Sequence, residues 1–196
     1  MDAAFYRAAL PEPFTICKVT LRPFSLGHAI LFKRCGLPFL DNSDEPTKSD
    51  FINALILCAC RYEEAVEVFQ DPNFYKTLKR WIKRVGTINL EEKVNLFYDY
   101  LKYHLDNVPL FARPEHGAPV EAPFEQVIKV TLMSKCNRTE SEALNMPYSL
   151  AVWDFLTFKA IDNQIQLLDR GNEAIRREDA DKFHEKWKAR INGRPS

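Results

Sequence analysis

The chain has 196 residues, of which 46% are hydrophobic and 12% aromatic, a composition that supports a core and excludes wholesale disorder. Lys and Arg together number 27, as do Asp and Glu, so the formal net charge is zero. This balance gives no overall attraction to nucleic acid or to an anionic membrane. No apolar run is long enough for a transmembrane helix, and the N-terminus lacks the apolar region of a signal peptide. We therefore expect a soluble, cytoplasmic protein.

The cysteines and histidines indicate no metal or cofactor site. Five cysteines without a signal peptide predict reduced thiols, because an odd number cannot pair completely within one chain. Cys58 and Cys60 are two positions apart and would point in opposite directions on a helix, so we do not expect them to chelate one metal. The histidines have neither HExxH nor HxH spacing.

The first elements in chain order are a short extended segment and a helix. Residues 14–21 alternate weakly between apolar and polar side chains, and we expect extended chain there because no partner strand is evident nearby. Ser25 is a good N-cap for a helix over 26–35, and Gly36 supplies its stop signal.

Four further helices are expected next along the chain, over 51–60, 63–70, 71–85 and 89–107. Ser49 or Asp50 is expected to cap the first of them. Asn89 with Glu92 resembles a capping box for the last, with Asn in place of Ser or Thr.

Residues 106–123 contain four prolines and form the one long stretch expected to be irregular. A linker, an exposed arm and an internal loop all fit this composition, and we favour a loop within one helical domain. A helix over 124–137 follows, then a helix opened by a Thr139–Glu142 capping box. Pro147 opens a last helix, through residue 168.

The sequence as a whole predicts an all-α fold. We expect a single compact bundle of about six to eight short helices over residues 1–171. The segment 172–196 is strongly charged and is predicted to be a solvated C-terminal helix or tail. The oligomeric state stays open.

Five basic residues without an intervening acid give the sharpest charge feature, at Lys76, Lys79, Arg80, Lys83 and Arg84. Their spacing places most of them on one helical face, opposite an apolar face. A solvated face over a packed face is the simplest interpretation. Docking of an acidic protein is the next, and nucleic-acid binding over 76–84 is the least favoured, because it also needs stacking aromatics or a groove-reading helix.

The run MPYSLAVWDFLTF is dense in large apolar side chains, including Trp153, Phe155 and Phe158. Such runs usually form core. If part of this one stays exposed, it forms a patch for a protein partner.

Two segments resemble proteins of tailed phages and prophages. Residues 21–40, LRPFSLGHAILFKRCGLPFL, resemble an Arg/Lys-Pro-aromatic-Ser/Thr-Leu-Gly-His phrase that opens small phage-associated helical proteins. Residues 139–163, TESEALNMPYSLAVWDFLTFKAIDN, resemble the C-terminal segment of tail-assembly chaperone-like proteins, where a helix follows a Met-Pro phrase. The two segments cover about a quarter of the chain, and region 62–123 has no counterpart.

The resemblance implies a non-catalytic assembly factor in the cytoplasm of a bacterial host. Such a protein would bind the helix-rich tape-measure protein, or another tail protein, before the tail tube forms. Contacts are expected at Trp153, Phe155 and Phe158, with Lys79, Arg80 and Lys83 as an electrostatic guide.

The competing hypothesis is an enzyme whose site is assembled from scattered residues. Its candidates are His28, Arg61, Glu64 and Asp154, which would have to converge in a pocket. No catalytic motif supports this, and the sequence favours a protein without enzymatic activity.

Overall fold

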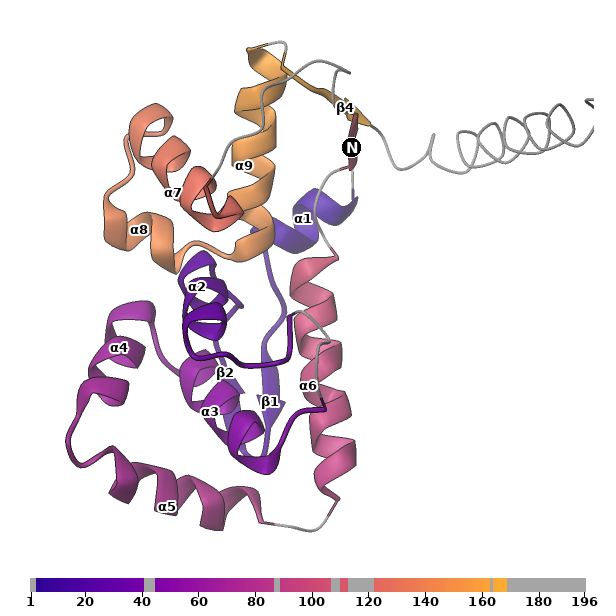
Figure 1. Cartoon of the computed structure of the whole chain (residues 1–196). Helices are drawn as coiled ribbons and strands as arrows, with labels where there is room; N and C mark the ends of the chain where they lie inside the picture. Colours follow the sequence, from indigo (N-terminus) through magenta and orange to yellow (C-terminus); the bar gives the residue numbers. More distant parts are fainter. Residues whose placement is uncertain are drawn as a thin grey trace, which may run out of the picture.

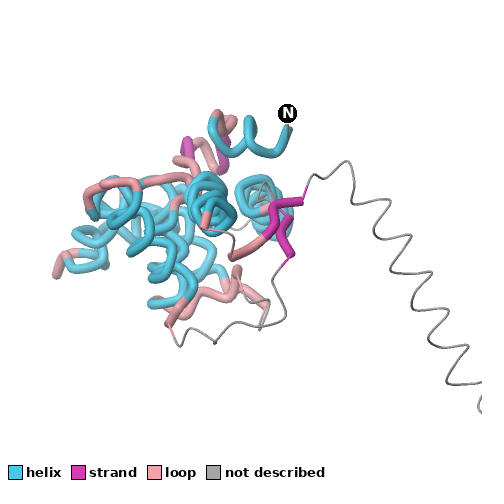
Figure 2. The backbone as a smooth tube through the Cα atoms, turned by 90° about the horizontal axis from the view of Figure 1, so that it is seen from above, coloured by secondary structure: helices cyan, strands magenta, loops and turns pink. Residues whose placement is uncertain are grey.

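A computed structural model describes residues 3–40, 45–86, 89–106, 110–112, 122–162 and 164–168. Helices dominate this part of the chain (Figures 1 and 2), which confirms the predicted fold class. The described residues form nine helices, slightly more than expected: α1 Ala3–Ala9, α2 Leu26–Arg34, α3 Lys48–Ala59, α4 Tyr62–Gln70, α5 Phe74–Val85, α6 Leu90–Leu105, α7 Phe124–Lys135, α8 Glu140–Asn145 and α9 Tyr148–Ile161.

The extended segment near 14–21 is a β-hairpin, with strands β1 Phe14–Ile16 and β2 Val19–Leu21 paired antiparallel. The segment therefore contains both partner strands, although the sequence shows no evident partner for it. The turn residues Cys17 and Lys18 have φ values of 53° and 61°. Two-residue hairpin turns of this kind usually carry Asn-Gly, so this turn lacks the usual sequence signal.

A second pair of strands corrects two expectations. Strand β3, Leu110–Ala112, lies within the segment expected to be irregular, and it pairs antiparallel with β4, Gln166–Leu168. The last helix accordingly ends at Ile161 and does not continue through residue 168. The remainder of the Pro-rich loop at 113–121 and the charged segment 172–196 lie outside the described residues.

Side-chain caps set several helix starts. The Ser25 cap of α2 is confirmed, and so is the Thr139–Glu142 capping box of α8. Helix α3 begins one turn earlier than expected, because Thr47 is its cap. The Asp50 carboxylate accepts a hydrogen bond from the Thr47 amide at 2.9 Å, so Asp50 completes a capping box rather than serving as the N-cap.

The expected capping box of α6 is wrong. Asn89 precedes the helix but has a φ of 55° in the left-handed region, and its side chain makes no cap hydrogen bond. An N-cap normally has an extended backbone, which aims its side chain at the first free amides of the helix. In the left-handed conformation, the Asn89 side chain is not directed at the free amides of α6.

The buried side chains form two hydrophobic cores. The large core lies among β1, β2 and helices α2 to α6 and includes Phe32, Phe97 and Tyr100. The small core lies among α7, α8 and α9 and includes Ile128 and Leu132. Helix α2 contributes to both, because Leu26 belongs to the small core and Phe32 to the large one.

The helices are arranged around these cores in an elongated molecule (Figure 1). Helices α7, α8 and α9 lie at one end, with α1 packed beside α9, and α2 stands between them and the rest. Helix α5 runs along the opposite end, and α6 rises along one side. In the part of the chain that the structure describes, no helix has the length and apolar character needed to span a membrane.

Candidate functional site

Two backbone segments far apart in the sequence meet at the junction of the two cores, called the seam below. The Leu26 amide donates a hydrogen bond to the Met146 carbonyl at 3.1 Å. The Tyr148 amide donates to the Phe24 carbonyl at 2.8 Å. The Pro-aromatic-Ser and Met-Pro sequences that were singled out within residues 21–40 and 139–163 therefore contact one another in the fold.

Gly27 lies in the closest part of the seam. A Cβ atom at this position would lie 2.5 Å from the Tyr62 ring and 2.8 Å from the Leu144 carbonyl oxygen. Only glycine fits without displacing the backbone of α8. The Leu-Gly-His phrase therefore has a structural reason, which is close packing of α2 against α4 and α8.

His28, a catalytic candidate of the enzyme hypothesis, is buried and uses both ring nitrogens in the fold. Its Nδ1 accepts a hydrogen bond from the Ser25 amide at 3.1 Å, while Nε2 lies 3.0 Å from the Cys60 carbonyl oxygen. Since Nδ1 accepts, the proton resides on Nε2 and is donated to Cys60. Burial lowers the pKa of His28 to about 4, so the ring is neutral at physiological pH. It caps α2 and holds α2 to the end of α3.

Arg61 and Glu64 lie near His28, but they also serve the start of a helix. The Arg61 amide donates to a Glu64 carboxylate oxygen at 2.7 Å, at the first turn of α4. Burial raises the pKa of the neighbouring Cys60 thiol, and the Glu64 charge raises it further. Cys60 therefore stays protonated near neutral pH, and a nucleophilic thiolate is not formed.

Asp154, the fourth enzyme candidate, lies on α9 and interacts with Cys136 and Arg138 at the far side of the small core. Burial raises the pKa of its carboxyl group. Arg61 and Glu64 are thus joined at the start of α4, and His28 is bound to Cys60, the residue before Arg61, whereas Asp154 interacts with other residues. Within the described ranges, no group of three or more His, Cys, Asp or Glu side chains could hold a metal ion.

An aromatic surface lies where α1 packs on α9, and we define it by Phe5, Tyr6 and Trp153. The ring centroids of Phe5 and Trp153 are 5.5 Å apart with an edge-to-face geometry, and those of Phe5 and Tyr6 are 5.9 Å apart. Phe5 is 39% exposed and Tyr6 is 45% exposed, while Trp153 is half-buried. Large rings exposed together in this way are typical of protein-binding patches.

The other two aromatic residues expected to contact a partner are placed differently. Phe155 is buried in the small core, where its ring packs edge-to-face on Phe124 with centroids 5.7 Å apart. Phe158 is half-buried on the same helix. Of the aromatic run, Trp153 alone joins the aromatic surface, whereas Phe155 is part of the small core.

Sequence reasoning missed Phe5 and Tyr6. Helix α1, which carries both residues, was not predicted from the sequence. Their proximity to Trp153 joins positions near opposite ends of the chain, and local patterns do not show it.

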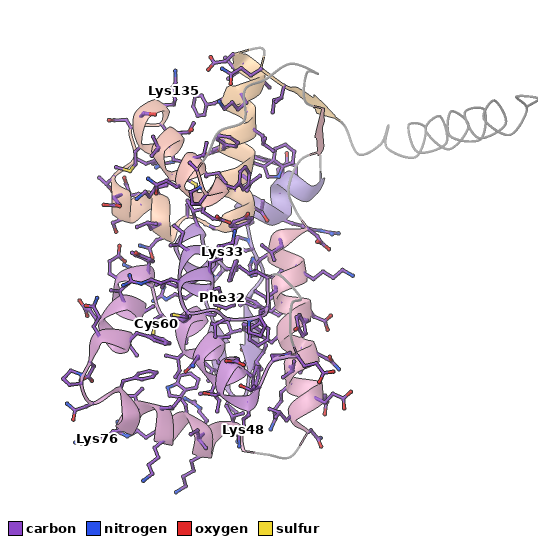
Figure 3. The ribbon with its side chains drawn as sticks, in the orientation of Figure 1. Phe32, Lys33, Lys48, Cys60, Lys76 and Lys135 are labelled. Atoms are coloured by element: carbon purple, nitrogen blue, oxygen red, sulfur yellow. The ribbon has the colours of Figure 1, made fainter. Side chains whose placement is uncertain are left out.

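The basic face of α5, defined by Lys76, Lys79, Arg80 and Lys83, is exposed as predicted. The opposite side of the helix packs on the large core through Phe74, Leu78, Trp81 and Val85. Figure 3 shows Lys76 at the outer end of α5, pointing away from the body of the molecule. The fifth cation, Arg84, is bound at the rim of the helix, where its guanidinium donates to the Lys18 carbonyl at 3.0 Å.

No protein-family model matches the chain, and neither a curated protein nor a solved structure was found to be significantly similar to it.

Proposed function

We propose that the protein is a non-catalytic assembly factor that binds an amphipathic helix of a protein partner through its aromatic surface. The main support is that Phe5 and Tyr6 of α1 are exposed beside Trp153 of α9, on which α1 packs. Aromatic side chains are the commonest anchors of protein interfaces, because they remove much apolar area from water and lose little rotamer freedom.

The partner that fits this proposal is a helix-rich tail protein of the tape-measure kind, in the cytoplasm of a bacterial host. This part rests on the resemblance of residues 21–40 and 139–163 to tail-assembly chaperone-like proteins. An apolar helix face that would otherwise aggregate would be covered by Phe5, Tyr6 and Trp153. The basic face of α5 would attract acidic segments of the same partner over a longer range.

The positions of the polar residues also favour binding over catalysis. His28 and Glu64 use their polar atoms to cap helices. The thiol of Cys60 is kept protonated, and Asp154 lies elsewhere. Among the described residues, the candidates of the enzyme hypothesis therefore do not supply a nucleophile with its base, and Asp154 does not lie with the others.

Co-expression with a tape-measure protein from the genome that encodes this chain tests the proposal. We expect the two proteins to co-purify and the soluble fraction of the partner to increase. The double substitution Phe5→Ala with Tyr6→Ala should weaken binding at least about tenfold, as expected for aromatic anchors. Val130→Ala, at an exposed apolar position of α7, is the matched control and should leave binding unchanged.

Two outcomes would overturn the proposal. One is that the wild-type protein neither co-purifies with the tail protein nor increases its solubility. The other is that Val130→Ala weakens binding as much as the change at Phe5 and Tyr6, because the aromatic surface would then have no special role.

A nucleic-acid regulator built on the basic face of α5 is the second candidate. The exposed cations at Lys76, Lys79, Arg80 and Lys83 favour it. The rings of Phe74 and Trp81, which could stack on bases, pack on the large core, and this disfavours the candidate. A salt-sensitive gel shift that disappears on reversing Lys79, Arg80 and Lys83 to Glu would establish this candidate.

A further inference from the structure

The outer face of α6 is the acidic counterpart of the basic face of α5. Glu91, Asn95 and Asp99 follow one another at four-residue intervals, and Glu92 and Leu96 lie beside them. These residues line an open hollow of about 500 Å³, together with Asn89. We define this acidic face of α6 by Glu91, Glu92 and Asp99. Lys102 lies one turn further on and ends it.

Helix dipoles account for only part of this charge pattern. Acids at the start of α6 and cations at the end of α5 stabilise the helix termini. Lys76, however, is in the first turn of α5, where a cation opposes the dipole, and Asp99 is in the middle of α6. The two faces therefore extend beyond what helix stability requires.

The two faces match in length and in apolar content. Lys76 to Lys83 spans about 10 Å and Glu91 to Asp99 about 12 Å at the rise of an α-helix. Each face has one exposed aliphatic side chain at its edge, with Ile82 42% exposed and Leu96 47% exposed. Two such helices laid side by side would pair opposite charges and bury both aliphatic side chains.

The two faces cannot meet within one molecule. Helix α5 lies along one end and α6 rises along the side in a different direction, so the two faces do not lie side by side (Figure 1). The charged side chains of both faces are exposed. Pairing of the basic face with the acidic face therefore requires a second copy of the chain. Because the net charge is zero, there is no overall electrostatic repulsion between the copies.

We propose that the protein associates head to tail with itself, with the basic face of α5 of one copy docked on the acidic face of α6 of the next. The contact joins two different faces, so each copy keeps one face of each kind for further copies. The assembly grows as an open chain or closes as a ring. This inference does not use the aromatic surface, but it shares the basic face of α5 with the proposed function, where that face attracts acidic segments of the partner.

Sedimentation velocity over a range of protein concentrations tests the proposal. At low salt the wild-type protein should form species larger than a monomer, increasingly so at higher concentration. They should dissociate near 1 M salt, where the screening length falls to about 3 Å. The triple variants K79E/R80E/K83E and E91K/E92K/D99K should each be monomeric. Reversal of Lys135 or of Asp162, which lie on other exposed surfaces, should have no effect.

Mixing the two triple variants gives the decisive result. One variant then has acidic side chains on both faces and the other has basic side chains on both faces, so neither variant pairs with itself but each pairs with the other. The mixture should therefore form species larger than a monomer, in which the two variants alternate in equal numbers. Combining all six reversals in one chain should restore association, because both faces then change sign together. Circular dichroism verifies that each variant is folded. N95K/D99K spares the first turn of α6 and replaces the triple acidic variant if that one unfolds.

A wild-type protein that stays monomeric at low salt and at the highest attainable concentration overturns the proposal. So does a mixture of the two variants that stays monomeric. The variant reversed on α6 should still bind the tail protein, because that face is outside the aromatic surface. Loss of self-association is thereby distinguished from failure of the proposed function.

Discussion

The two cores are built from different side chains. In the large core, the Phe97 ring lies within 6.4 Å of the Phe32 ring and within 5.1 Å and 5.9 Å of the Phe39 and Phe51 rings, measured between centroids. The small core is mostly aliphatic, with Phe155 as its one buried ring and Tyr148 partly buried against it. Aromatic pairs prefer particular orientations, so the large core fixes the geometry of its helices more strongly than the small core can.

The small core also depends on the rest of the molecule. Leu26, which is fully buried within it, comes from α2, whose other buried side chains belong to the large core. The Leu26 amide is bound to the Met146 carbonyl across the seam. The comparison indicates that the large core stabilises the fold and that the small core is organised by docking onto it.

The largest effect is expected from truncating the centre of the large core. Phe97→Ala should lower the free energy of unfolding by about 3–5 kcal/mol, because it removes a ring packed on several others and leaves a cavity. Leu132→Ala, the matched change in the small core, should cost less, within the range of about 2–5 kcal/mol. Urea denaturation followed by fluorescence and by circular dichroism measures both. If Leu132→Ala lowered the free energy of unfolding more than Phe97→Ala, the small core would contribute more to stability than the large core, contrary to this comparison.

Acidification should weaken the seam. Burial lowers the pKa of His28 to about 4 and that of His104 also to about 4, from an ordinary value of 6.5. The unfolded chain therefore binds protons that the folded chain excludes. Stability is full above pH 6.5 and declines as the pH falls toward 4, by about 3 kcal/mol for each histidine.

The measurement is the free energy of unfolding from urea titrations at several pH values across this window. His28→Gln removes one titrating group and should flatten the slope by about 1.4 kcal/mol per pH unit at its steepest. His104→Gln is the parallel test, at the residue whose carbonyl accepts a hydrogen bond from the Ser149 hydroxyl of α9. An unchanged slope in both variants would show that neither histidine is buried neutral.

A smaller and more local effect is expected at Gly27. Gly27→Ala introduces a Cβ that collides with the Leu144 carbonyl, so the seam must open at a cost of about 1–3 kcal/mol. Gly36→Ala is the control, because a Cβ atom at Gly36 would meet no neighbouring atom. Its φ of 62° means that the substitution strains the local backbone without a steric clash. Hydrogen exchange at the Leu26 and Tyr148 amides should accelerate in the first variant only. Equal acceleration in both would mean that the contact at Gly27 does not hold the cores together.

Helix caps and helical periodicity, which depend on residues close together in the sequence, predicted several helices correctly. Ser25 and Gly36 bound α2 as expected, and Thr139 with Glu142 opens α8. The basic face of α5 was predicted because helical spacing alone separates its cations from Trp81 and Val85. In each case residues within a few positions determine the result, through caps or through the periodicity of the helix.

The errors came from backbone conformation and from distant contacts. Asn89 has the right chemistry for a cap, but its left-handed φ takes the side chain away from the helix. The turn residues Cys17 and Lys18 have positive φ values, which Cys and Lys rarely adopt, so the sequence does not indicate this turn. Strand β3 pairs with β4, which lies more than 50 residues further along the chain, and Phe5 packs on Trp153 across most of the chain. The seam also joins segments that are far apart in the sequence. Such contacts depend on how the helices dock.

The placement of Leu26 has a consequence for dividing the protein into two pieces. A cut within residues 113–121 would leave nearly all of the large core on the first fragment and the small core on the second, except for Leu26. The second fragment would therefore lack one fully buried side chain and the backbone partner of Met146. Its helices would become ordered when the first fragment supplies α2, which is the behaviour required of a split reporter that signals when its halves are brought together.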